Sequence, residues 1–408
     1  MKNLLIAQSG GPTAAINATV AGIVSRAYES KEVDRVLGAL NGIEGVLEES
    51  FIDMREKIKS REDMDLLCQT PSAALGSCRL KLKDMKDANL QIEEIIQIFR
   101  KYEITYFIYI GGNDSMDTVD KLSAYLADHH INDITVVGAP KTIDNDLEEI
   151  DHCPGFGSAA KYIGTTFLEL ERDCHVYATK TVTIVEVMGR NTGWLTAAAS
   201  LARVNGGRGP DLIYLCEIPF CNDRFIKDVE KQLRGNDSVL IAISEGIKYS
   251  DGQYVSEQVQ SNFVDAFGHS YISGAARVLE DIIRNTIGCK VRSLALSLMQ
   301  RCAGHIRSTI DIKESKLLGI KACECVLQGE NGKMASLIRT SNFPYKIEIT
   351  AIPVHQVCNH ERRVPRSYIN SEGNDITDEM MQYLFPLIQG EDLEIQYKNG
   401  IPRHLTLY

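Results

Sequence analysis

The sequence has 408 residues, of which 44% are hydrophobic and 24% are charged, the composition of a soluble globular protein. Its formal net charge of -11 argues against a nucleic-acid binder, which would show a basic surface. The length exceeds that of one ordinary core, so two domains or one elaborated α/β unit are expected.

Apolar runs and cysteines point to a cytoplasmic protein. The N-terminal run "MKNLLIAQSGG" breaks into glycine too early for a signal peptide, and no run approaches the roughly 18 apolar residues of a membrane span. The 11 cysteines are scattered and form no C-x-x-C pair, which argues against a zinc site and favours reduced thiols.

The first part of the chain alternates predicted strands and helices. Strands are expected at residues 3–8, 35–40, 105–112 and 134–140. Helices are expected at 14–30, 89–103 and 115–130, with a polar, helix-rich stretch up to about residue 70. This alternation predicts a parallel, doubly wound sheet, in which ligands bind beyond the carboxyl ends of the strands. The polar strings "SGGPT", "GGNDS" and "PKTIDND" fall at those ends.

The second part repeats this pattern. Strands are expected at residues 181–187, 212–218, 239–246, 292–301 and 333–340. Helices are expected at 194–205 and 312–330, a surface insertion at 248–262, and a loop plus helix at 363–391.

Common nucleotide and hydrolase signatures are absent from the sequence. The string "GENGKMAS" has Met after its lysine and fails as a Walker A loop. A G-x-G-x-x-A string at Gly155–Ala160 follows Cys-Pro rather than a strand, and no G-x-S-x-G elbow occurs. Gly10 and Gly11 would suit an anion at a helix start, but taken alone they indicate a plain strand-to-helix turn. Arg79 would suit a phosphate, but taken alone it indicates a solvated arginine.

Six strings in a fixed order change this reading. Ser9-Gly10-Gly11, "GGNDS", "PKTIDND", "VEVMGR", "SEG" and "MQR" together resemble the phosphofructokinase family over nearly the whole chain. The resemblance implies two Rossmann-like parallel-sheet domains, with the active site in the cleft between them, plus a C-terminal extension. The expected donor domain spans 1–155, completed by about 302–345. The sugar-phosphate domain spans 156–301 and the extension 346–408.

The "TIDND" string carries the catalytic residues that the resemblance implies. Asp144 is the general base that takes the proton of the C1 hydroxyl of fructose 6-phosphate, and a carboxylate suits that task at neutral pH. Thr142 contacts the transferred phosphoryl group, and Lys141 assists catalysis; Thr142 and Asp144 also belong to the substrate-binding set. Asp146 and Asp114 are the expected ligands of Mg²⁺, since phosphoryl transfer requires charge stabilisation.

The remaining strings carry substrate residues by the same resemblance. Gly11 and Arg79 match the donor-phosphate side. Sugar binding is assigned to Met188, Gly189, Arg190 and Glu245. Arg292 and Arg301 match the clamp on the 6-phosphate, and two guanidinium forks suit a dianion.

Two positions indicate the phosphoryl donor. Asp114 would crowd and repel a nucleotide where ATP enzymes of the family carry Gly, and Lys141 offers an ammonium to pyrophosphate. The expected activity is therefore reversible transfer from pyrophosphate to fructose 6-phosphate in glycolysis. An ATP-dependent 6-phosphofructokinase is the alternative. A non-catalytic regulatory subunit ranks lower, because "TIDND" and "MGR" are both intact.

Three positions depart from the family pattern. Asn113 stands where an acidic, metal-side residue is expected. Thr181 stands where the family has an arginine that reaches across subunits, and Lys180 is the candidate replacement. Leu298 stands where a sugar-phosphate contact is expected. The resemblance predicts a homodimer or homotetramer in which Lys180 and Arg292 serve a neighbour's site.

Overall fold

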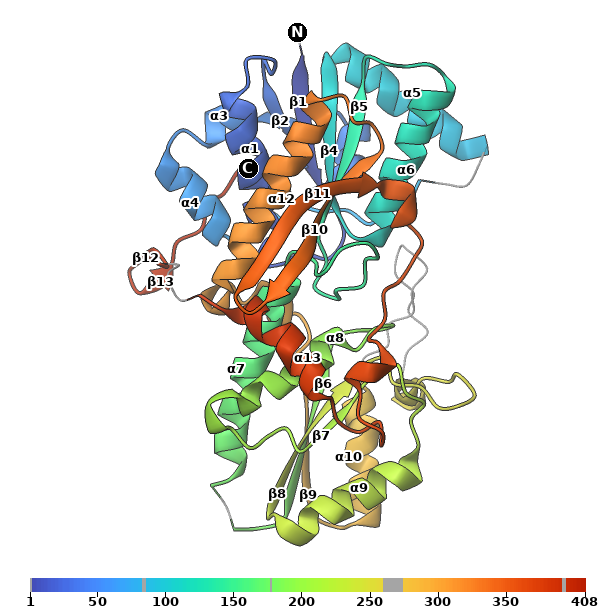
Figure 1. Cartoon of the computed structure of the whole chain (residues 1–408), viewed down its shortest axis with the longest axis vertical. Helices are drawn as coiled ribbons and strands as arrows, with labels where there is room; N and C mark the ends of the chain where they lie inside the picture. Colours follow the sequence, from blue (N-terminus) through green and yellow to red (C-terminus); the bar gives the residue numbers. More distant parts are fainter. Residues whose placement is uncertain (1, 83–85, 177, 260–273, 391–393) are drawn as a thin grey trace. The chain divides into compact units, whose positions relative to one another are not determined.

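Two sheets organise the chain, each within its own compact unit. The structure is a computed structural model that describes residues 2–82, 86–176, 178–259, 274–390 and 394–408. Unit 1 comprises Met1–Ser158, Arg301–Glu361 and Gly390–Tyr408, and unit 2 comprises Ala159–Gln300 and Arg362–Gln389 (Figure 1).

Unit 1 is built on a seven-stranded sheet in the order β11-β10-β5-β4-β1-β2-β3. The strands are β1 Asn3–Gln8, β2 Val36–Ala39, β3 Phe51–Asp53, β4 Ile104–Gly111, β5 Thr135–Pro140, β10 Lys333–Asn342 and β11 Tyr345–Pro353. The five central strands pair in parallel, whereas β3 and β11 join the two edges antiparallel. Every residue of β1 is buried, as expected for a parallel strand covered on both faces.

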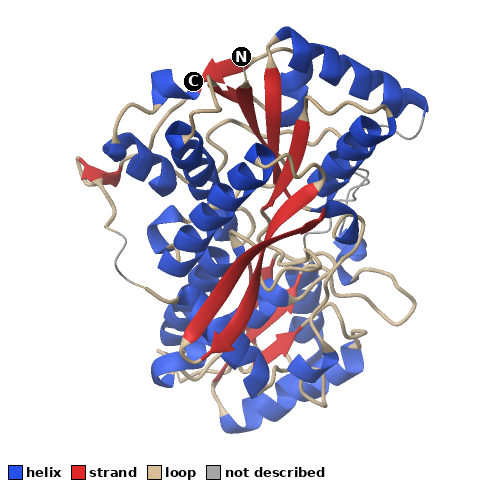
Figure 2. Cartoon of the chain, turned by 45° about the horizontal axis from the view of Figure 1, so that its top comes forward, coloured by secondary structure: helices blue, strands red, loops and turns tan. Residues whose placement is uncertain are grey.

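Helices flank this sheet (Figure 2). They are α1 Ile16–Glu29, α2 Gly42–Leu47, α3 Met54–Lys57, α4 Arg61–Gln69, α5 Lys86–Lys101, α6 Asn113–Asp128, α12 Thr309–Leu327 and the short turns η3 Gly304–Ile306 and η4 Val354–Gln356. Helices α1 and α12 lie side by side (Figure 1), and glycines permit their close approach. A Cβ on Gly22 would lie 2.0 Å from the Lys316 carbonyl oxygen, and one on Gly319 would lie 2.1 Å from that of Thr19.

The last segment returns to unit 1. It holds the small hairpin of β12 Tyr397–Lys398 and β13 Ile401–Pro402. The Gln69 side chain donates to the carbonyl oxygens of Gln396 and Arg403, and Leu407 is buried in the core of the unit.

Unit 2 contains a four-stranded parallel sheet in the order β7-β8-β6-β9. Its strands are β6 Thr181–Val187, β7 Leu212–Tyr214, β8 Ser238–Ser244 and β9 Lys290–Ala295. Its helices are α8 Trp194–Ala197, η1 Ala198–Gly206, α9 Asn222–Gly235, η2 Val255–Val259, α10 Ala275–Thr286, η5 Arg366–Tyr368, α13 Asp378–Leu384 and η6 Phe385–Ile388. Two further helices, α7 Phe156–Cys174 and α11 Met299–Cys302, cross the unit boundaries.

The predicted α/β class with parallel sheets is confirmed, but two predicted elements are wrong in detail. The strand expected at 292–301 ends at Ala295, because Ser297 has a left-handed φ of 45° and a helical turn follows. The helix expected at 194–205 passes into 3₁₀ turns and ends in a kink, where Val204 and Asn205 leave the helical conformation.

Other elements were not predicted, among them α7, α9, α10 and β11. Part of the predicted insertion, 260–262, lies outside the described residues. The segment expected as a separate extension, 346–408, is divided: 346–361 and 390–408 belong to unit 1 and 362–389 to unit 2. The functional assignment of the domains and the cleft between them stay predictions.

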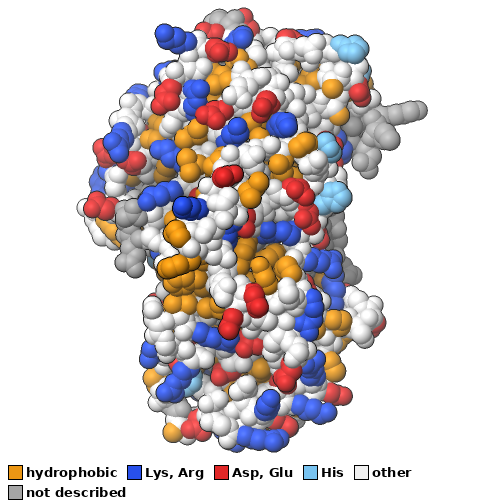
Figure 3. All heavy atoms as spheres, in the orientation of Figure 1, with side chains coloured by type: hydrophobic (Ala, Val, Ile, Leu, Met, Phe, Trp, Pro, Cys, Tyr) orange, Lys and Arg blue, Asp and Glu red, His pale blue; other side chains and the backbone are white. Residues whose placement is uncertain are grey.

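The surface agrees with the composition. Lysine and arginine side chains alternate with aspartate and glutamate on the face in Figure 3 rather than gathering in one basic patch. Among the helices of the described residues, none combines the length and apolar character that a membrane span requires.

Candidate active site

The turns after β1, β4 and β5 meet in unit 1. These strands are neighbours in a parallel sheet, so their carboxyl ends share one edge. The hydroxyls of Ser9 and Ser115 lie 2.8 Å apart, and the Lys141 amide donates to the Gly111 carbonyl at 2.8 Å. A Cβ on Gly112 would contact the backbone of Lys141 at 3.5 Å. The strings "SGG", "GGNDS" and "PKTIDND" therefore form one continuous surface.

Lys141 is buried at the centre of this surface. Its side chain is 2% exposed, and its Nζ donates to the carbonyl oxygen of Gly11 at 2.7 Å. Burial lowers the pKa of Lys141 to about 8, while the charge of Asp144 opposes that change and those of Arg301 and Arg79 add to it. Burial, with the charge of Arg79, also lowers the pKa of Arg301.

Lys141, Arg301 and Arg79 lie close enough to repel one another, and a bound anion would reduce that repulsion. A Cβ on Gly11 would lie 3.3 Å from Nη1 of Arg301, so this arginine faces the turn after β1. Arg301 was predicted to hold the sugar phosphate; in unit 1 it lies with the predicted donor-side residues Gly11 and Arg79.

The two aspartates of "TIDND" lie two residues apart on the loop after β5. The Asp144 amide donates to Oγ1 of Thr142 at 3.1 Å. Asn145, between the aspartates, takes a left-handed φ of 57°, and its buried Oδ1 accepts from the Cys153 amide at 2.9 Å. This internal hydrogen bond fixes the loop and holds both carboxylates in place.

Asp146 is the more strongly perturbed of the two. Burial and then the charge of Asp144 raise the pKa of Asp146 to about 7, and Glu361 contributes in the same direction. Its Oδ1 is buried without a hydrogen-bond partner. A buried, unpartnered carboxylate oxygen beside a second carboxylate fits a divalent cation.

Mg²⁺ commonly takes one or two carboxylates and completes its shell with water and substrate phosphates, so a site for it need not contain three acidic side chains. Within the described residues, no set of three His, Cys, Asp or Glu side chains is arranged to hold a metal ion. Asp114, the other predicted ligand, lies in the first turn of α6 with Oδ1 3.2 Å from Nζ of Lys81.

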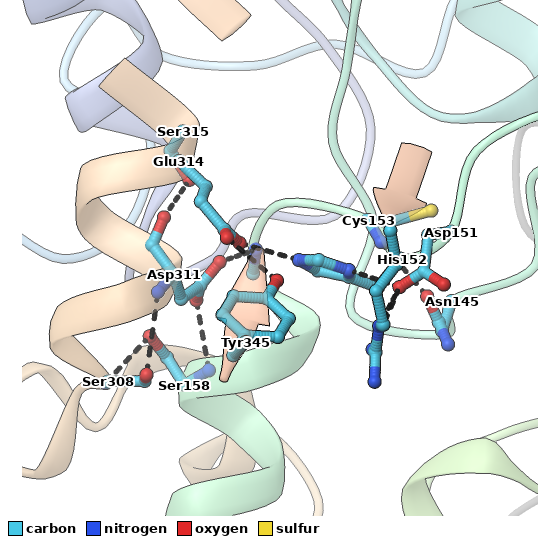
Figure 4. A network of polar contacts seen from close by, with 12 residues as sticks. Asn145, Asp151, His152, Cys153, Ser158, Ser308, Asp311, Glu314, Ser315 and Tyr345 are labelled. Atoms are coloured by element: carbon cyan, nitrogen blue, oxygen red, sulfur yellow. Dashed lines mark hydrogen bonds and ion pairs between the residues drawn. The ribbon is translucent and has the colours of Figure 1, made fainter. Parts of the chain in front are cut away.

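Residues 151–158, which follow the "TIDND" string, are held by α12, as Figure 4 shows. Asp311 accepts from the amides of Gly155 and Ser158 at 2.8 and 2.9 Å, which also caps the start of α7. Buried His152 lies between Asp151 at 2.7 Å and Glu314 at 2.6 Å.

The charge state of His152 follows from these partners. Burial alone would lower the pKa of His152, but Glu314 and Asp151 outweigh it and raise the pKa to about 9. The loop that carries Asp144 and Asp146 is thus anchored through the contacts of His152 with Asp151 and Glu314. The sequence offered only the string "IDHCPG" as a signal, and its partner on α12 was not predictable from it.

The predicted sugar residues cluster at the carboxyl ends of β6 and β8 in unit 2. The Gly189 amide donates to Oε1 of Glu245 at 3.2 Å, and the Met188 amide to Oε1 of Gln300 at 3.3 Å. Burial raises the pKa of Glu245 to about 7, whereas the Gly189 amide and the charge of Arg190 act in the opposite direction. A carboxyl in this position can accept hydrogen bonds from the hydroxyls of a polar ligand.

Arg292 lies apart from this cluster. It is opposite Thr183 in the β6–β9 register, and Thr183 precedes Met188 by five residues, or roughly 16 Å of strand. The Arg292 side chain is 46% exposed, with Nη1 3.8 Å from Oδ2 of Asp173. Lys180, the other predicted cross-subunit cation, precedes β6 at the same end.

Two residues that the sequence analysis did not predict, Glu217 and Arg362, also support the segment that follows the "MGR" string. Glu217 accepts from the amides of Gly193 at 2.8 Å and Val364 at 3.0 Å, and burial raises the pKa of its carboxyl. Arg362 stacks over the Trp194 ring at 4.7 Å, and the Trp194 indole donates to the Arg362 carbonyl at 3.0 Å. Segment 362–389 therefore forms part of the structure around the predicted sugar loop.

Comparisons with known proteins find similar sequences and structures that cover nearly the whole chain. A family model described as Phosphofructokinase matches residues 3–326. Two curated enzymes named pyrophosphate–fructose 6-phosphate 1-phosphotransferase are similar. The one from Halomonas elongata is 40% identical over 98% of this chain and 95% of its own length. The one from Methylococcus capsulatus is 39% identical over 100% and 96%. The crystal structure of a pyrophosphate-dependent phosphofructokinase from Nitrosospira multiformis has a TM-score of 0.88 at 35% identity, covering 99% of this chain and 96% of that one.

Proposed function

The chain belongs to the phosphofructokinase family, and on that premise we propose how it acts. It is a pyrophosphate-dependent phosphotransferase. It moves a phosphoryl group reversibly from pyrophosphate to the C1 hydroxyl of fructose 6-phosphate, giving fructose 1,6-bisphosphate and phosphate. The observation that carries the residue roles is the meeting of Lys141, Arg301, Asp144 and Asp146 at one sheet edge.

Asp144 is the general base. Its carboxylate takes the C1 hydroxyl proton as that oxygen attacks the nearer phosphorus of pyrophosphate, and the bridging P–O bond breaks to release phosphate. Thr142 donates a hydrogen bond to the transferred group. Thr142 is bonded to the Asp144 amide, so the two groups are held together. Positioning of this kind is the main protein contribution to phosphoryl transfer.

Lys141, Arg79 and the amides around Gly11 bind pyrophosphate. The ammonium of Lys141 has three donors. One donates to the Gly11 carbonyl, and we propose that the others donate to the anion. A bound anion would also oppose the charges of Arg301 and Arg79, which add to the effect of burial in lowering the pKa of Lys141. Pyrophosphate, which carries dense negative charge, is therefore a suitable partner for the ammonium of Lys141.

Asp146 and Asp114 would hold Mg²⁺, and the bound ion would supply positive charge to the phosphate oxygens. Asp146 offers its unpartnered Oδ1, and a bound cation would offset the charge of Asp144, which after burial raises the pKa of Asp146. Asp114 makes an exposed ion pair with Lys81, a weak interaction that a cation can replace.

Met188, Gly189, Arg190 and Glu245 bind the sugar, and Arg292 and Arg301 bind its 6-phosphate. The exposure of Arg292 and its distance along the sheet from Met188 support a site that Arg292 completes in a neighbouring subunit, together with Lys180. The active form is then a homodimer or homotetramer. Its predicted cytoplasmic location stays a prediction.

One assay separates this function from ATP dependence. The purified protein is given fructose 6-phosphate and Mg²⁺ with either pyrophosphate or ATP, and fructose 1,6-bisphosphate is measured. We expect turnover with pyrophosphate and at most a trace with ATP; the reverse reaction should require inorganic phosphate. A higher kcat/KM with ATP would reject the donor assignment.

A further inference from the structure

Asn113 makes a two-way contact with a distant piece of backbone. Its Oδ1 accepts from the amide of Asn359 at 2.6 Å, and its Nδ2 donates to the carbonyl oxygen of His360. Asn359 adds a third bond by donating from Nδ2 to Oδ1 of Asp117 at 3.0 Å. All four residues belong to unit 1, and Asn113 and Asp117 lie in the first turns of α6.

Only an amide can make both bonds of Asn113. A carboxylate has acceptors alone, so an aspartate there would keep the bond from Asn359 and point a negative charge at the His360 carbonyl. Aspartate is nevertheless the residue that the resemblance leads one to expect at position 113, on the metal side. The contact gives that departure a physical reason.

The segment 359–360, which Asn113 binds, follows directly after residues that are buried in the core of unit 1. Val357 and Cys358 are buried in the unit 1 core, and the chain then turns at Asn359, whose φ is 64°. The chain leaves the unit after Glu361, the residue whose charge, after burial and Asp144, helps to raise the pKa of Asp146.

Asn113 also lies between two donor-side features. Its predecessor Gly112 abuts the backbone of Lys141 and the side chain of Thr142, and its successor is Asp114. A shift of this turn would move the groups that we propose surround pyrophosphate.

We propose that Asn113 is a positioning residue: it binds the 359–360 backbone to the first turn of α6, and so fixes Asp114 and Glu361 on the metal and pyrophosphate side. This rests on the proposed function. The amide acts here through hydrogen bonds to the chain and is not itself a metal ligand.

Asn113→Asp tests this proposal directly, because a metal-binding role and a positioning role at residue 113 predict opposite changes in kcat/KM. If position 113 serves the metal, a restored carboxylate should bind Mn²⁺ more tightly and keep or raise kcat/KM. If Asn113 holds the segment, the change removes a donor and adds repulsion. We then expect KM for pyrophosphate to rise by roughly 5- to 30-fold, the factor for 1–2 kcal/mol. Mn²⁺ affinity, measured by titration, should not increase.

A matched control exists in the same unit. Asn331 makes the same two-way contact: its Oδ1 accepts from the Val136 amide and its Nδ2 donates to the Ser123 carbonyl, both at 3.0 Å. Asn331→Asp should lower stability to a similar degree and leave KM for pyrophosphate unchanged. Equal kinetic effects of the two changes would reduce Asn113 to a general stability residue and overturn the proposal.

Amide hydrogen exchange separates this inference from the function on which it rests. In Asn113→Asp, peptides covering 359–361 should exchange faster than in the wild type, and in Asn331→Asp they should not. This readout needs no turnover, so it stands even if the donor assignment fails. Unchanged exchange at 359–361, or tighter Mn²⁺ binding, would overturn the proposal.

Discussion

The Nζ of Lys141 lies 2.7 Å from the carbonyl oxygen of Gly11 and joins the turns that follow β5 and β1, on either side of β4. One buried cation thus holds together two turns that both face the predicted donor. Its charge is expensive to bury, which is why its pKa falls to about 8, and a bound anion offsets that cost.

Lys141→Met should lower kcat/KM for pyrophosphate by about 10- to 150-fold, because a charged hydrogen bond contributes about 1.5–3 kcal/mol. Methionine keeps the buried volume, so the loss reports charge rather than a cavity.

Asp114→Gly should permit slight ATP use, and the double variant should shift the preference further. The kcat/KM for both donors is measured in all four proteins. Intact pyrophosphate use in Lys141→Met would contradict this account.

Asp144→Asn should remove the proton acceptor and lower kcat by roughly 10²–10⁴-fold, with KM for both substrates little changed. The amide is near-isosteric with the carboxyl, so the loop held by Asn145 and Cys153 should keep its shape. Glu148→Gln, in the same loop, serves as the control. Near-normal turnover in Asp144→Asn would exclude it as the base.

Asp146→Asn should stabilise the metal-free protein above pH 7. The pKa of Asp146 rises from 3.8 to about 7 on folding, so between these values the unfolded chain releases a proton that the folded one keeps. Stability then falls as pH rises through this window and stays reduced above it. The variant lacks this penalty, which is on the order of a few kcal/mol.

Urea unfolding in chelator at pH 5 and pH 8 measures this effect. The gap in unfolding free energy between Asp146→Asn and wild type should widen from pH 5 to pH 8, whereas the exposed Asp133→Asn should give no such widening. Adding Mg²⁺ should stabilise the wild type more than the variant. A gap that is constant with pH would show that Asp146 is ordinarily ionised in the folded protein.

Arg292→Ala and Asp144→Asn should complement each other if Arg292 serves a neighbouring subunit. Each variant alone should be nearly inactive. Mixed oligomers, prepared by co-expression with two affinity tags, should regain activity, because some sites then receive both an intact Asp144 and an intact Arg292. Sedimentation velocity establishes that oligomers form. A fully active monomer, or no recovery in the mixed oligomer, would refute a shared site.

The sequence identified residues that are close along the chain better than the contacts between distant ones. "TIDND" and "MGR" follow strands, so their place at a sheet edge was predictable from local pattern. Asn113 looked like a lost metal ligand, because its partner Asn359 is 246 residues away. The approach of Arg301 to Gly11 was likewise not predictable, because the two residues lie far apart in the sequence, and its role toward the 6-phosphate stays a prediction.

Missed elements have different causes. Helix α9 shows clear apolar spacing, with Phe225, Val229 and Leu233 buried on one face, and was within reach of sequence reasoning. Strand β11 was not, because most of its residues are only partly buried and its place at the sheet edge depends on pairing with β10.

The division of unit 1 into three stretches determines the order in which it can fold during synthesis. Residues 1–158 leave the ribosome first, but β5 lacks its neighbour β10, and α1 lacks its neighbour α12, until residues 301–342 have followed. Leu407 is inserted later still. Until residues 301–342 are made, the β5 edge and the α1 face that later contact β10 and α12 lack these neighbours, and unpaired strand edges and uncovered apolar faces favour aggregation.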